Sequence, residues 1–255
     1  MTAAATAFSL EGKRALVTGA SRGLGAAMAR ALAQAGADVA LHERQEPCAC
    51  AESIAAEFGV RTACVTADLS DPRAAARLVQ DATDALGPLD IVVNNAGIIR
   101  RAAAAEYSDE DWDEVIQVNI SSVFRVCREA GKGMLARGSG KIINIASLLA
   151  FQGGIRVPAY AAAKGAVAQL TKALANEWAS TGVNVNAIAP GYMKTENTRP
   201  LVEDPSRYRD ITARIPAGRW GEPADLAGPV VFLASSASDY VNGHVLVVDG
   251  GWMAR

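Results

Sequence analysis

The chain has 255 residues, of which 50% are hydrophobic, so it can bury the core of a large α/β domain. Its formal charge is −2, and no basic run stands out, which argues against nucleic acid or an anionic membrane as a partner and favours small molecules and copies of the same chain. Two histidines, His42 and His244, leave little room for a multi-histidine metal site or for imidazole acid/base chemistry. We therefore expect no metal.

The N-terminal segment and the cysteines predict the compartment. The first Lys or Arg is Lys13, the basic and apolar regions of an export signal are absent, and no apolar run reaches membrane-spanning length. The cysteines lack the C-x-x-C spacing of a zinc ribbon or redox site, which fits thiols in a reducing cytosol. We expect a soluble, cytoplasmic protein.

Short β-rich segments alternate with longer helical ones, and no low-complexity linker divides them. Strands are expected at 14–19, 38–43, 62–66, 90–94, 141–146, 183–188 and 244–249, and a helix at 24–35. Parallel strands need long crossovers, which lay helices on both faces of the sheet. The expected fold is α/β: a single doubly wound, Rossmann-like, three-layer domain over 1–255, with a seven-stranded parallel sheet and helices on both faces.

The turn after the first expected strand is rich in glycine. It reads TGASRGLG at 18–25, with glycines spaced G-x-x-x-G-x-G. Any strand-to-helix turn can use a glycine, but this one follows the first strand and opens a helix, so its backbone N–H groups can approach a pyrophosphate. Cofactor contacts are expected from Gly19, Ser21, Arg22, Gly23, Leu24 and Gly25.

Glu43 ends the second expected strand, where a carboxylate can accept the adenosine ribose hydroxyls and repel a 2′-phosphate. This favours NAD as the cofactor. Arg44 and Arg22 could instead hold a 2′-phosphate, so NADP is the alternative, and a solvated strand end is the non-functional interpretation. Short residues after the third and fourth strands suit adenine and ribose contacts; they are Asp68, Leu69, Asn95, Ala96 and Gly97.

Several motifs in chain order resemble those of the short-chain dehydrogenase/reductase family: TGASRGLG at 18–25, NNAG at 94–97, Asn119, Ser147, Tyr160-x-x-x-Lys164 and Pro190-Gly191. The resemblance runs from about residue 10 to the C-terminus. It implies an oxidoreductase with the catalytic set Asn119, Ser147, Tyr160 and Lys164, in which Asn119 acts through a water chain. It also implies a homotetramer and cofactor contacts from Tyr160, Lys164, Pro190, Gly191 and Thr195.

Hydride transfer from an alcohol needs a base for the hydroxyl proton. Tyr160 and Lys164 are four residues apart on an expected helix, so they share a face. An ammonium about 5 Å from the phenol, at an effective dielectric of about 20, favours the phenolate by roughly 3 kcal/mol, or about two pKa units. Ser147 can hydrogen-bond the reacting oxygen. The non-functional interpretation is a surface Tyr/Lys pair, a turn serine and a helix asparagine.

Further stretches, including 147–160, 189–198 and 214–229, are similar to the bacterial 2-dehydro-3-deoxy-D-gluconate 5-dehydrogenases, also called 2-deoxy-D-gluconate 3-dehydrogenases, with gluconate 5-dehydrogenases as a close second. A sugar acid needs a cation for its carboxylate and polar groups for its hydroxyls. Substrate contacts are expected from Arg101, Ser147, Gln152, Arg156 and Tyr160, and a substrate lid at 191–217. Helix capping or surface pairing would explain the two arginines equally well.

Two other hypotheses stay open. A 3-oxoacyl-(acyl-carrier-protein) reductase would use a basic patch, which Arg125, Arg128 and Lys132 could form, although a solvated helix face is the simpler interpretation. A non-catalytic dinucleotide-binding regulatory protein would be expected to lose Tyr160 or Lys164, and both are present. Ala- and Val-rich helices expected around 109–136 and 158–181 offer apolar surface for assembly.

Overall fold

Seven parallel strands form one sheet in the order β3-β2-β1-β4-β5-β6-β7. The structure is a computed structural model that describes residues 6–45 and 50–255. The expected α/β fold is confirmed, and each strand lies within two residues of its expected bounds. The strands are β1 (Arg14–Val17), β2 (Asp38–Glu43), β3 (Thr62–Thr66), β4 (Ile91–Asn94), β5 (Gly140–Ile145), β6 (Val183–Pro190) and β7 (Val245–Val248).

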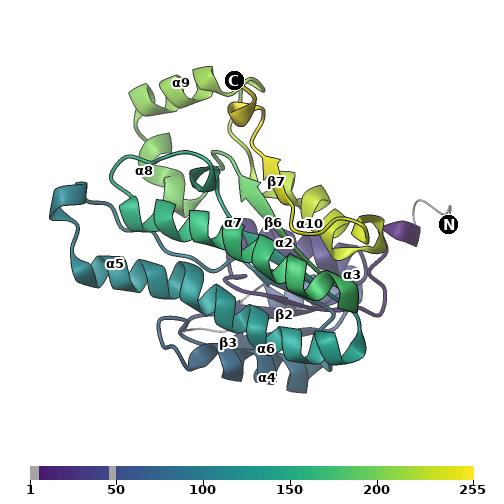
Figure 1. Ribbon diagram of the computed structural model, residues 1–255. Coiled ribbons are helices and arrows are strands. Elements are labelled where there is room, and N and C mark those ends of the chain that lie inside the picture. Colours follow the sequence, from purple (N-terminus) through teal and green to yellow (C-terminus); the bar gives the residue numbers. More distant parts are fainter. Residues whose placement is uncertain (1–5, 46–49) are drawn as a thin grey trace.

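Helices cover both faces of the sheet (Figure 1). The helices α2 (Gly23–Gln34), α3 (Ala51–Phe58) and α10 (Ala227–Ala234) lie on one face, and α4 (Ala74–Leu86), α6 (Ser122–Arg137) and α7 (Pro158–Trp178) on the other. Side chains alternate along each strand: Ala15 and Val17 of β1 enter the core under α2, whereas Leu16 enters the core under α4 and α6. In the described part of the chain, no helix is long and apolar enough to cross a membrane.

The helical segment expected around 109–136 is present, and it contains a π-helical turn that the sequence did not predict. It divides into α5 (Asp109–Ile116), a π-helical turn (Gln117–Ser121) and α6. Sequence periodicity alone does not register one wide turn inside an apolar helix. Such turns occur frequently at functional sites, and this one contains Asn119.

The segment after β6 extends beyond the carboxyl ends of the strands. It contains η5 (Glu196–Thr198), α8 (Arg199–Val202) and α9 (Pro205–Arg214), which Figure 1 shows beside the C-terminus. Ile211 and Ile215 are buried in a small apolar cluster with Trp220 and Trp252, so α9 has its own packing against the body. Short helical turns fill other connections: η1 (Ala104–Glu106), η3 (Leu148–Ala150), η4 (Ala179–Thr181), η6 (Pro223–Leu226), η7 (Ser236–Ser238) and η8 (Trp252–Ala254).

Candidate active site

Two cavities open beyond the carboxyl ends of the strands. The larger has a volume of about 1270 Å³ and the smaller about 500 Å³. The order of the sheet reverses between β1 and β4, and the larger cavity is lined from the loops after both strands. This is where open α/β sheets bind ligands. Tyr160 lines both cavities, so a ligand in either one would approach its side chain.

The glycine-rich turn forms one wall of the larger cavity. Gly19 and Gly23 have positive φ angles of 63° and 56°, and a Cβ on Gly25 would lie 2.0 Å from the Gly19 carbonyl oxygen. Helix α2 begins next to the turn, and no side chain caps its first N–H groups. Uncapped amides at a helix N-terminus, with Gly23 and Gly25 in the first turn, leave room and donors for a phosphate group.

His42 supports the glycine-rich turn, a role that sequence reasoning missed. The Gly19 amide donates to Nδ1 of His42 over 3.1 Å, and Nε2 lies 2.9 Å from the Ala67 carbonyl oxygen. The side chain is 3% exposed, and burial lowers the pKa of His42, so the neutral ring with a proton on Nε2 satisfies both contacts. The sequence signal for this role was His42 itself, a polar residue near the end of a strand whose other central residues are apolar and buried.

The loop after β4 is tied to the same turn. The Asn95 side chain donates to the carbonyl oxygens of Thr18 and Gly19 over 2.9 and 3.0 Å, and the Thr18 hydroxyl accepts from the amides of Asn95 and Ala96. Asn95 lines the larger cavity as expected, but both amide hydrogens of its side chain are used within the protein. These bonds hold the two loops on either side of the switch point together.

Carboxylates stand at one end of the larger cavity. Burial raises the pKa of Glu43, but hydrogen bonds from Ser21 and from the Arg44 amide outweigh this and hold it below its usual value. The Ser70 amide donates to Asp68 over 2.9 Å and lowers the pKa of that carboxyl. Both groups are therefore ionised acceptors at neutral pH.

The larger cavity collects nearly all of the expected cofactor residues. Its lining includes Gly19, Ser21, Arg22, Gly23, Leu24, Gly25, Glu43, Arg44, Asp68, Leu69, Asn95, Ala96, Gly97, Tyr160, Lys164 and Thr195. Pro190 and Gly191 line the smaller cavity instead. In Gly191, a Cβ would lie 2.6 Å from the Cα atom of Asp249, so only glycine allows this approach of β6 to the end of β7.

Tyr160 and Lys164 share one face of α7, as expected. The Lys164 Nζ atom lies 5.6 Å from the centre of the Tyr160 ring and donates to the Ile145 carbonyl oxygen over 2.5 Å. Burial lowers the pKa of Lys164 to about 8. Loss of hydration raises the pKa of Tyr160 above its usual value, although a hydrogen bond with Ser147 and the charge of Arg101 lower it. The predicted fall in the phenol pKa beside Lys164 is therefore wrong for this structure, because desolvation dominates.

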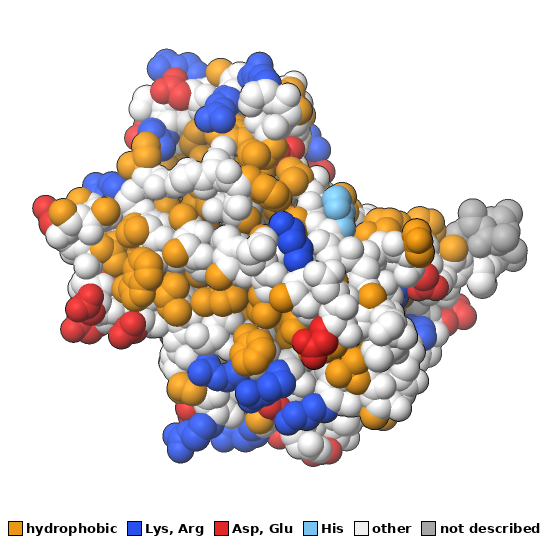
Figure 2. Space-filling model, in the orientation of Figure 1, with side chains coloured by type: hydrophobic (Ala, Val, Ile, Leu, Met, Phe, Trp, Pro, Cys, Tyr) orange, Lys and Arg blue, Asp and Glu red, His pale blue; other side chains and the backbone are white. Residues whose placement is uncertain are grey.

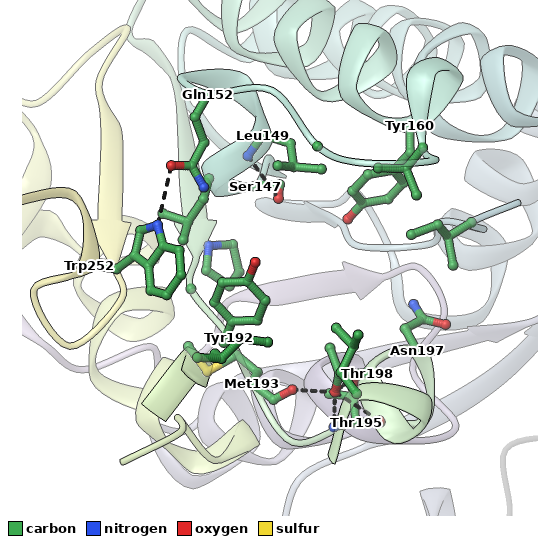
Figure 3. Close-up of a pocket in the computed structure, with 18 of the residues that line it drawn as sticks. Ser147, Leu149, Gln152, Tyr160, Tyr192, Met193, Thr195, Asn197, Thr198 and Trp252 are labelled. Atoms are coloured by element: carbon green, nitrogen blue, oxygen red, sulfur yellow. Dashed lines mark hydrogen bonds between the residues drawn. The ribbon is translucent and has the colours of Figure 1, made fainter. Parts of the chain in front are cut away.

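Ser147 and Asn119 differ in how they reach the cavities. Ser147 lies at the start of η3, accepts from the Leu149 amide over 3.2 Å, and lines the smaller cavity near Tyr160 (Figure 3). Asn119 is fully buried and lines neither cavity. Its side chain accepts from the Ile98 amide over 2.8 Å and donates to the Ile98 carbonyl oxygen over 2.7 Å. The structure thus uses this side chain to fix the loop after β4.

The smaller cavity contains three of the expected substrate residues besides Ser147, namely Arg101, Gln152 and Tyr160. Arg101 donates to the Asn197 carbonyl oxygen over 2.8 Å. Arg156 does not line the cavity, which corrects its expected position: it occupies a turn with a φ of 64° and its carbonyl accepts from the Ala102 amide.

Sequence reasoning missed several aromatic and basic residues of this lining. They are Tyr192, Arg207, Arg214 and Trp252. Arg207 and Arg214 are seven residues apart on α9, so they project from one face of this helix. The seven-residue spacing of the two arginines could have been recognised in the sequence. It indicates a binding site only when α9 lies over the cavity, and the spacing alone does not predict that position.

Comparison with known proteins decides the family. A family model described as enoyl-(acyl carrier protein) reductase matches residues 19–253. The 2-dehydro-3-deoxy-D-gluconate 5-dehydrogenase of Escherichia coli (strain K12) is 55% identical over 251 residues, which cover 98% of this chain and 99% of the relative. The chain belongs to the short-chain dehydrogenase/reductase family.

Solved structures of this family superpose closely on the enzyme. A protein from Agrobacterium tumefaciens, described as a candidate 2-deoxy-D-gluconate 3-dehydrogenase with bound NADP, has a TM-score of 0.92 and 54% identity, covering 98% of this chain and 99% of its own. A gluconate 5-dehydrogenase from Burkholderia cenocepacia J2315, in complex with NADP and tartrate, has a TM-score of 0.95 and 41% identity, covering 99% of both chains. The enzyme is therefore an oxidoreductase of this family that acts on CH–OH groups.

The larger cavity fits the nicotinamide dinucleotide that the family uses. The uncapped N-terminus of α2 and the glycines beside it suit a pyrophosphate, and the Glu43 carboxylate suits ribose hydroxyls. Tyr160 and Lys164 also line this cavity, and Tyr160 lines the smaller one as well. A ligand that extends through the larger cavity would reach Tyr160 and Lys164.

Proposed function

We propose that the enzyme transfers a hydride between NAD(P) and a hydroxyl or keto group of a sugar acid, 2-dehydro-3-deoxy-D-gluconate or 2-deoxy-D-gluconate. The observation that carries this proposal is that Tyr160, with Ser147 beside it in the lining, stands where a dinucleotide-sized cavity meets a smaller cavity with a cationic lining. The names of the Escherichia coli and Agrobacterium relatives support the choice of substrate. Gluconate 5-dehydrogenation, the activity of the Burkholderia relative, is the close alternative.

Tyr160 is proposed to move the proton at the reacting oxygen. When bound, a nicotinamide supplies the hydride acceptor or donor. With a raised pKa, the Tyr160 phenol is protonated at neutral pH and can act as the acid in ketone reduction. In alcohol oxidation the phenolate takes the hydroxyl proton, and the Ser147 hydrogen bond and the Arg101 charge favour that anion. Ser147 also holds the reacting oxygen by a hydrogen bond.

Lys164 and Asn119 are proposed to support this step. Lys164 has a pKa of about 8, so it can hold or release a proton near neutral pH beside Tyr160. Asn119 contributes to a water chain towards Lys164 in our proposal. Because its side chain is bonded to Ile98, we assign this contribution to its backbone carbonyl in the π-helical turn.

The choice between NAD and NADP depends on Glu43 in this proposal. An ionised carboxylate at the end of β2 repels a 2′-phosphate and accepts ribose hydroxyls, which favours NAD. Arg22 and Arg44 line the same cavity and would hold a 2′-phosphate if the enzyme uses NADP. The Agrobacterium and Burkholderia relatives have bound NADP, which supports the second alternative.

We also propose that the enzyme assembles as a homotetramer in the cytoplasm. Trp112 and Phe124, on α5 and α6, are 40% and 42% exposed. Figure 2 shows hydrophobic side chains gathered over the face that α5, α6 and α7 occupy in Figure 1. Burying this surface between copies would remove it from water. Cys50 and Cys127 are free thiols, which is compatible with a reducing compartment, while Cys48 lies outside the described residues.

Residues 191–217 are proposed to form the substrate lid of a single domain over 1–255. Asn197, Leu201 and Ile211 from this segment line the smaller cavity, so its position controls access to Ser147 and Tyr160. Arg101 reaches across to the Asn197 carbonyl oxygen, which is one contact that would change if the segment moved.

The test is nicotinamide absorbance with purified enzyme, NAD or NADP, and a panel of deoxy-keto-gluconates, gluconates and acyl-carrier-protein ketones. We expect turnover of a sugar acid. Arg128 and Lys132, part of the patch that a carrier protein would need, both form ion pairs with Glu129, which reduces the net charge of this face. Brisk acyl reduction without sugar-acid turnover would contradict the proposal, as would cofactor binding without any turnover.

A further inference from the structure

The end of the smaller cavity away from Tyr160 contains a cluster built around Trp252. The indole N–H of Trp252 donates to Oε1 of Gln152 over 3.2 Å, and the guanidinium carbon of Arg214 lies 3.9 Å from the centre of the Trp252 ring. Trp252 itself is 4% exposed. Figure 3 shows Trp252 and Gln152 on the opposite side of the cavity from Tyr160, with Ser147 between them.

Trp252 sets the orientation of both polar side chains. Because the indole N–H occupies Oε1 of Gln152, the amide is oriented with its Nε2 donors free for another partner. Stacking on the ring face leaves the edge of the Arg214 guanidinium, which carries its N–H groups, available for a planar anion. Among the ion pairs of the described residues, none involves Arg214.

The C-terminal segment fixes this cluster in place. Asp249 accepts from the amides of Gly251 and Met253, both over 2.8 Å, which shapes the turn that holds Trp252. Arg255 donates to the carbonyl oxygens of Ala213 and Arg214 over 2.8 and 3.2 Å, so the C-terminus also holds the last turn of α9. Two segments far apart in the chain thus meet at one indole ring.

We propose that Arg214 and Gln152, positioned by Trp252, bind the carboxylate of the substrate. This inference rests on the proposed sugar-acid activity. In a substrate oxidised at C5 with its carboxylate at C1, four bonds of about 1.5 Å place the two groups about 5 Å apart. The carboxylate therefore lies away from the reacting oxygen and from Tyr160. Arg101 acts on the pKa of Tyr160 and so belongs to the reacting end, whereas Arg214 lies at the Trp252 end.

The charge of the lining supports an anionic ligand. The lining contains three arginines, Arg101, Arg207 and Arg214, and one carboxylate, Asp210. The Asp210 carboxylate forms an ion pair with Arg209 over 3.5 Å. A carboxylate offers two oxygens in one plane, and a guanidinium edge and an amide donor can bind both. A neutral sugar would leave this donor set without its matching charge.

The experiment compares 2-dehydro-3-deoxy-D-gluconate with its carboxamide in the wild-type enzyme and in Arg214→Leu. We expect the variant to raise KM for the acid about 10- to 150-fold, the effect of losing a charged hydrogen bond, and to leave KM for the carboxamide nearly unchanged. Arg77→Leu is the control, because Arg77 is an exposed arginine of α4 outside both cavity linings, and it should leave both KM values unchanged.

Two further variants keep the test informative if Arg214→Leu does not fold. Arg214→Lys keeps the charge without the planar fork and should raise KM for the acid by a smaller factor. Trp252→Phe keeps a ring face but loses the N–H that orients Gln152, and it should also raise KM for the acid selectively. Cofactor affinity, measured by titration, should be the same in all folded variants.

The outcomes separate this inference from the proposed function. If the wild-type enzyme oxidises the acid and Arg214→Leu leaves its KM unchanged, or raises KM equally for acid and carboxamide, the carboxylate subsite is wrong while the proposed function stands. If the wild-type enzyme oxidises no sugar acid, the proposed function fails first. A selective loss on the acid supports both.

Discussion

The Nζ atom of Lys164 lies 5.6 Å from the centre of the Tyr160 ring, yet its hydrogen bond goes to the Ile145 carbonyl oxygen. The ammonium is therefore fixed under the site by the backbone of β5 and is nearly buried, with 4% of the residue exposed. A buried ammonium is costly, and the pKa of about 8 reflects that cost. The enzyme retains a group at this position that weakens its fold.

Lys164→Met should stabilise the protein while abolishing turnover. Lowering the pKa of Lys164 from 10.5 to about 8 destabilises the folded wild type by about 3 kcal/mol at neutral pH. The variant is free of this destabilisation but loses the hydrogen bond to Ile145, which contributes about 1 kcal/mol, so its free energy of unfolding should be about 2 kcal/mol higher. The wild-type stability should rise with pH from about 8 to 10.5, since the unfolded chain binds more protons there, and the variant should lose this rise. Urea unfolding measures both. A less stable Lys164→Met at neutral pH would contradict this account.

Ser147→Ala should shift the pH profile of alcohol oxidation. The hydrogen bond with Ser147 lowers the pKa of Tyr160, so its removal should raise that pKa further and move the acidic limb of kcat/KM to higher pH. Loss of a donor to the reacting oxygen should also lower kcat by about 10²- to 10³-fold. The profile is measured by nicotinamide absorbance across pH. A lower kcat with an unmoved limb would remove the Ser147 contact from the control of Tyr160.

Glu43→Ala should relax discrimination against NADP. Like charges about 6 Å apart at an effective dielectric of about 20 repel by about 3 kcal/mol before screening, so the ratio of kcat/KM for NADP to that for NAD should rise about 10- to 100-fold. Steady-state kinetics with both cofactors provides this ratio, with Asp71→Ala as a control on an exposed carboxylate outside the cavity lining. An unchanged ratio in Glu43→Ala would show that Glu43 does not contact the ribose.

His42→Ala should weaken both the fold and cofactor binding. The Gly19 amide would lose its acceptor inside the protein, at a cost of about 1 to 3 kcal/mol, and the glycine-rich turn would lose its support. His42→Gln retains an acceptor and a donor and should restore part of the cofactor affinity. Titration of the nicotinamide cofactor and urea unfolding are the two measurements.

The same histidine predicts a dependence of stability on pH. Burial lowers the pKa of His42 below 6.5, even though Glu43 and Asp68 act to raise it, so the unfolded chain binds the proton first as pH falls. The contribution of His42 is complete above 6.5 and is lost as pH falls through the lowered value. The difference in unfolding free energy between about pH 7.5 and about pH 5.5 should thus be smaller in His42→Ala than in the wild type. Equal differences would contradict a buried neutral ring.

The fold and most of the lining of the larger cavity could be predicted from the sequence because their signals are local. Alternating apolar segments fix the strands, and Gly19, Gly23 and Gly25 mark a turn whose backbone must approach a ligand. The four-residue spacing of Tyr160 and Lys164 fixes their common face in any helix.

The remaining features depend on tertiary packing. The pKa of Tyr160 is raised by partial desolvation, which depends on neighbours from other segments, and spacing within α7 contains no information about those neighbours. Arg156 occupies a turn with a φ of 64° outside the cavity lining, whereas Arg214 lines the cavity because α9 packs against Trp252 near the C-terminus. Asn119 turns towards Ile98 because the π-helical turn places it there, a change of register that periodicity does not predict.

The most direct test of the central claim is the oxidation of 2-dehydro-3-deoxy-D-gluconate by wild-type enzyme and by Tyr160→Phe, followed by nicotinamide absorbance with NAD and with NADP. The account predicts turnover by the wild type and none by Tyr160→Phe, with nearly equal cofactor affinity in both proteins, because only the phenol oxygen is lost. Retained turnover in Tyr160→Phe would remove Tyr160 from the chemistry. Absence of sugar-acid turnover in the wild type, beside brisk reduction of an acyl-carrier-protein ketone, would contradict the proposed substrate.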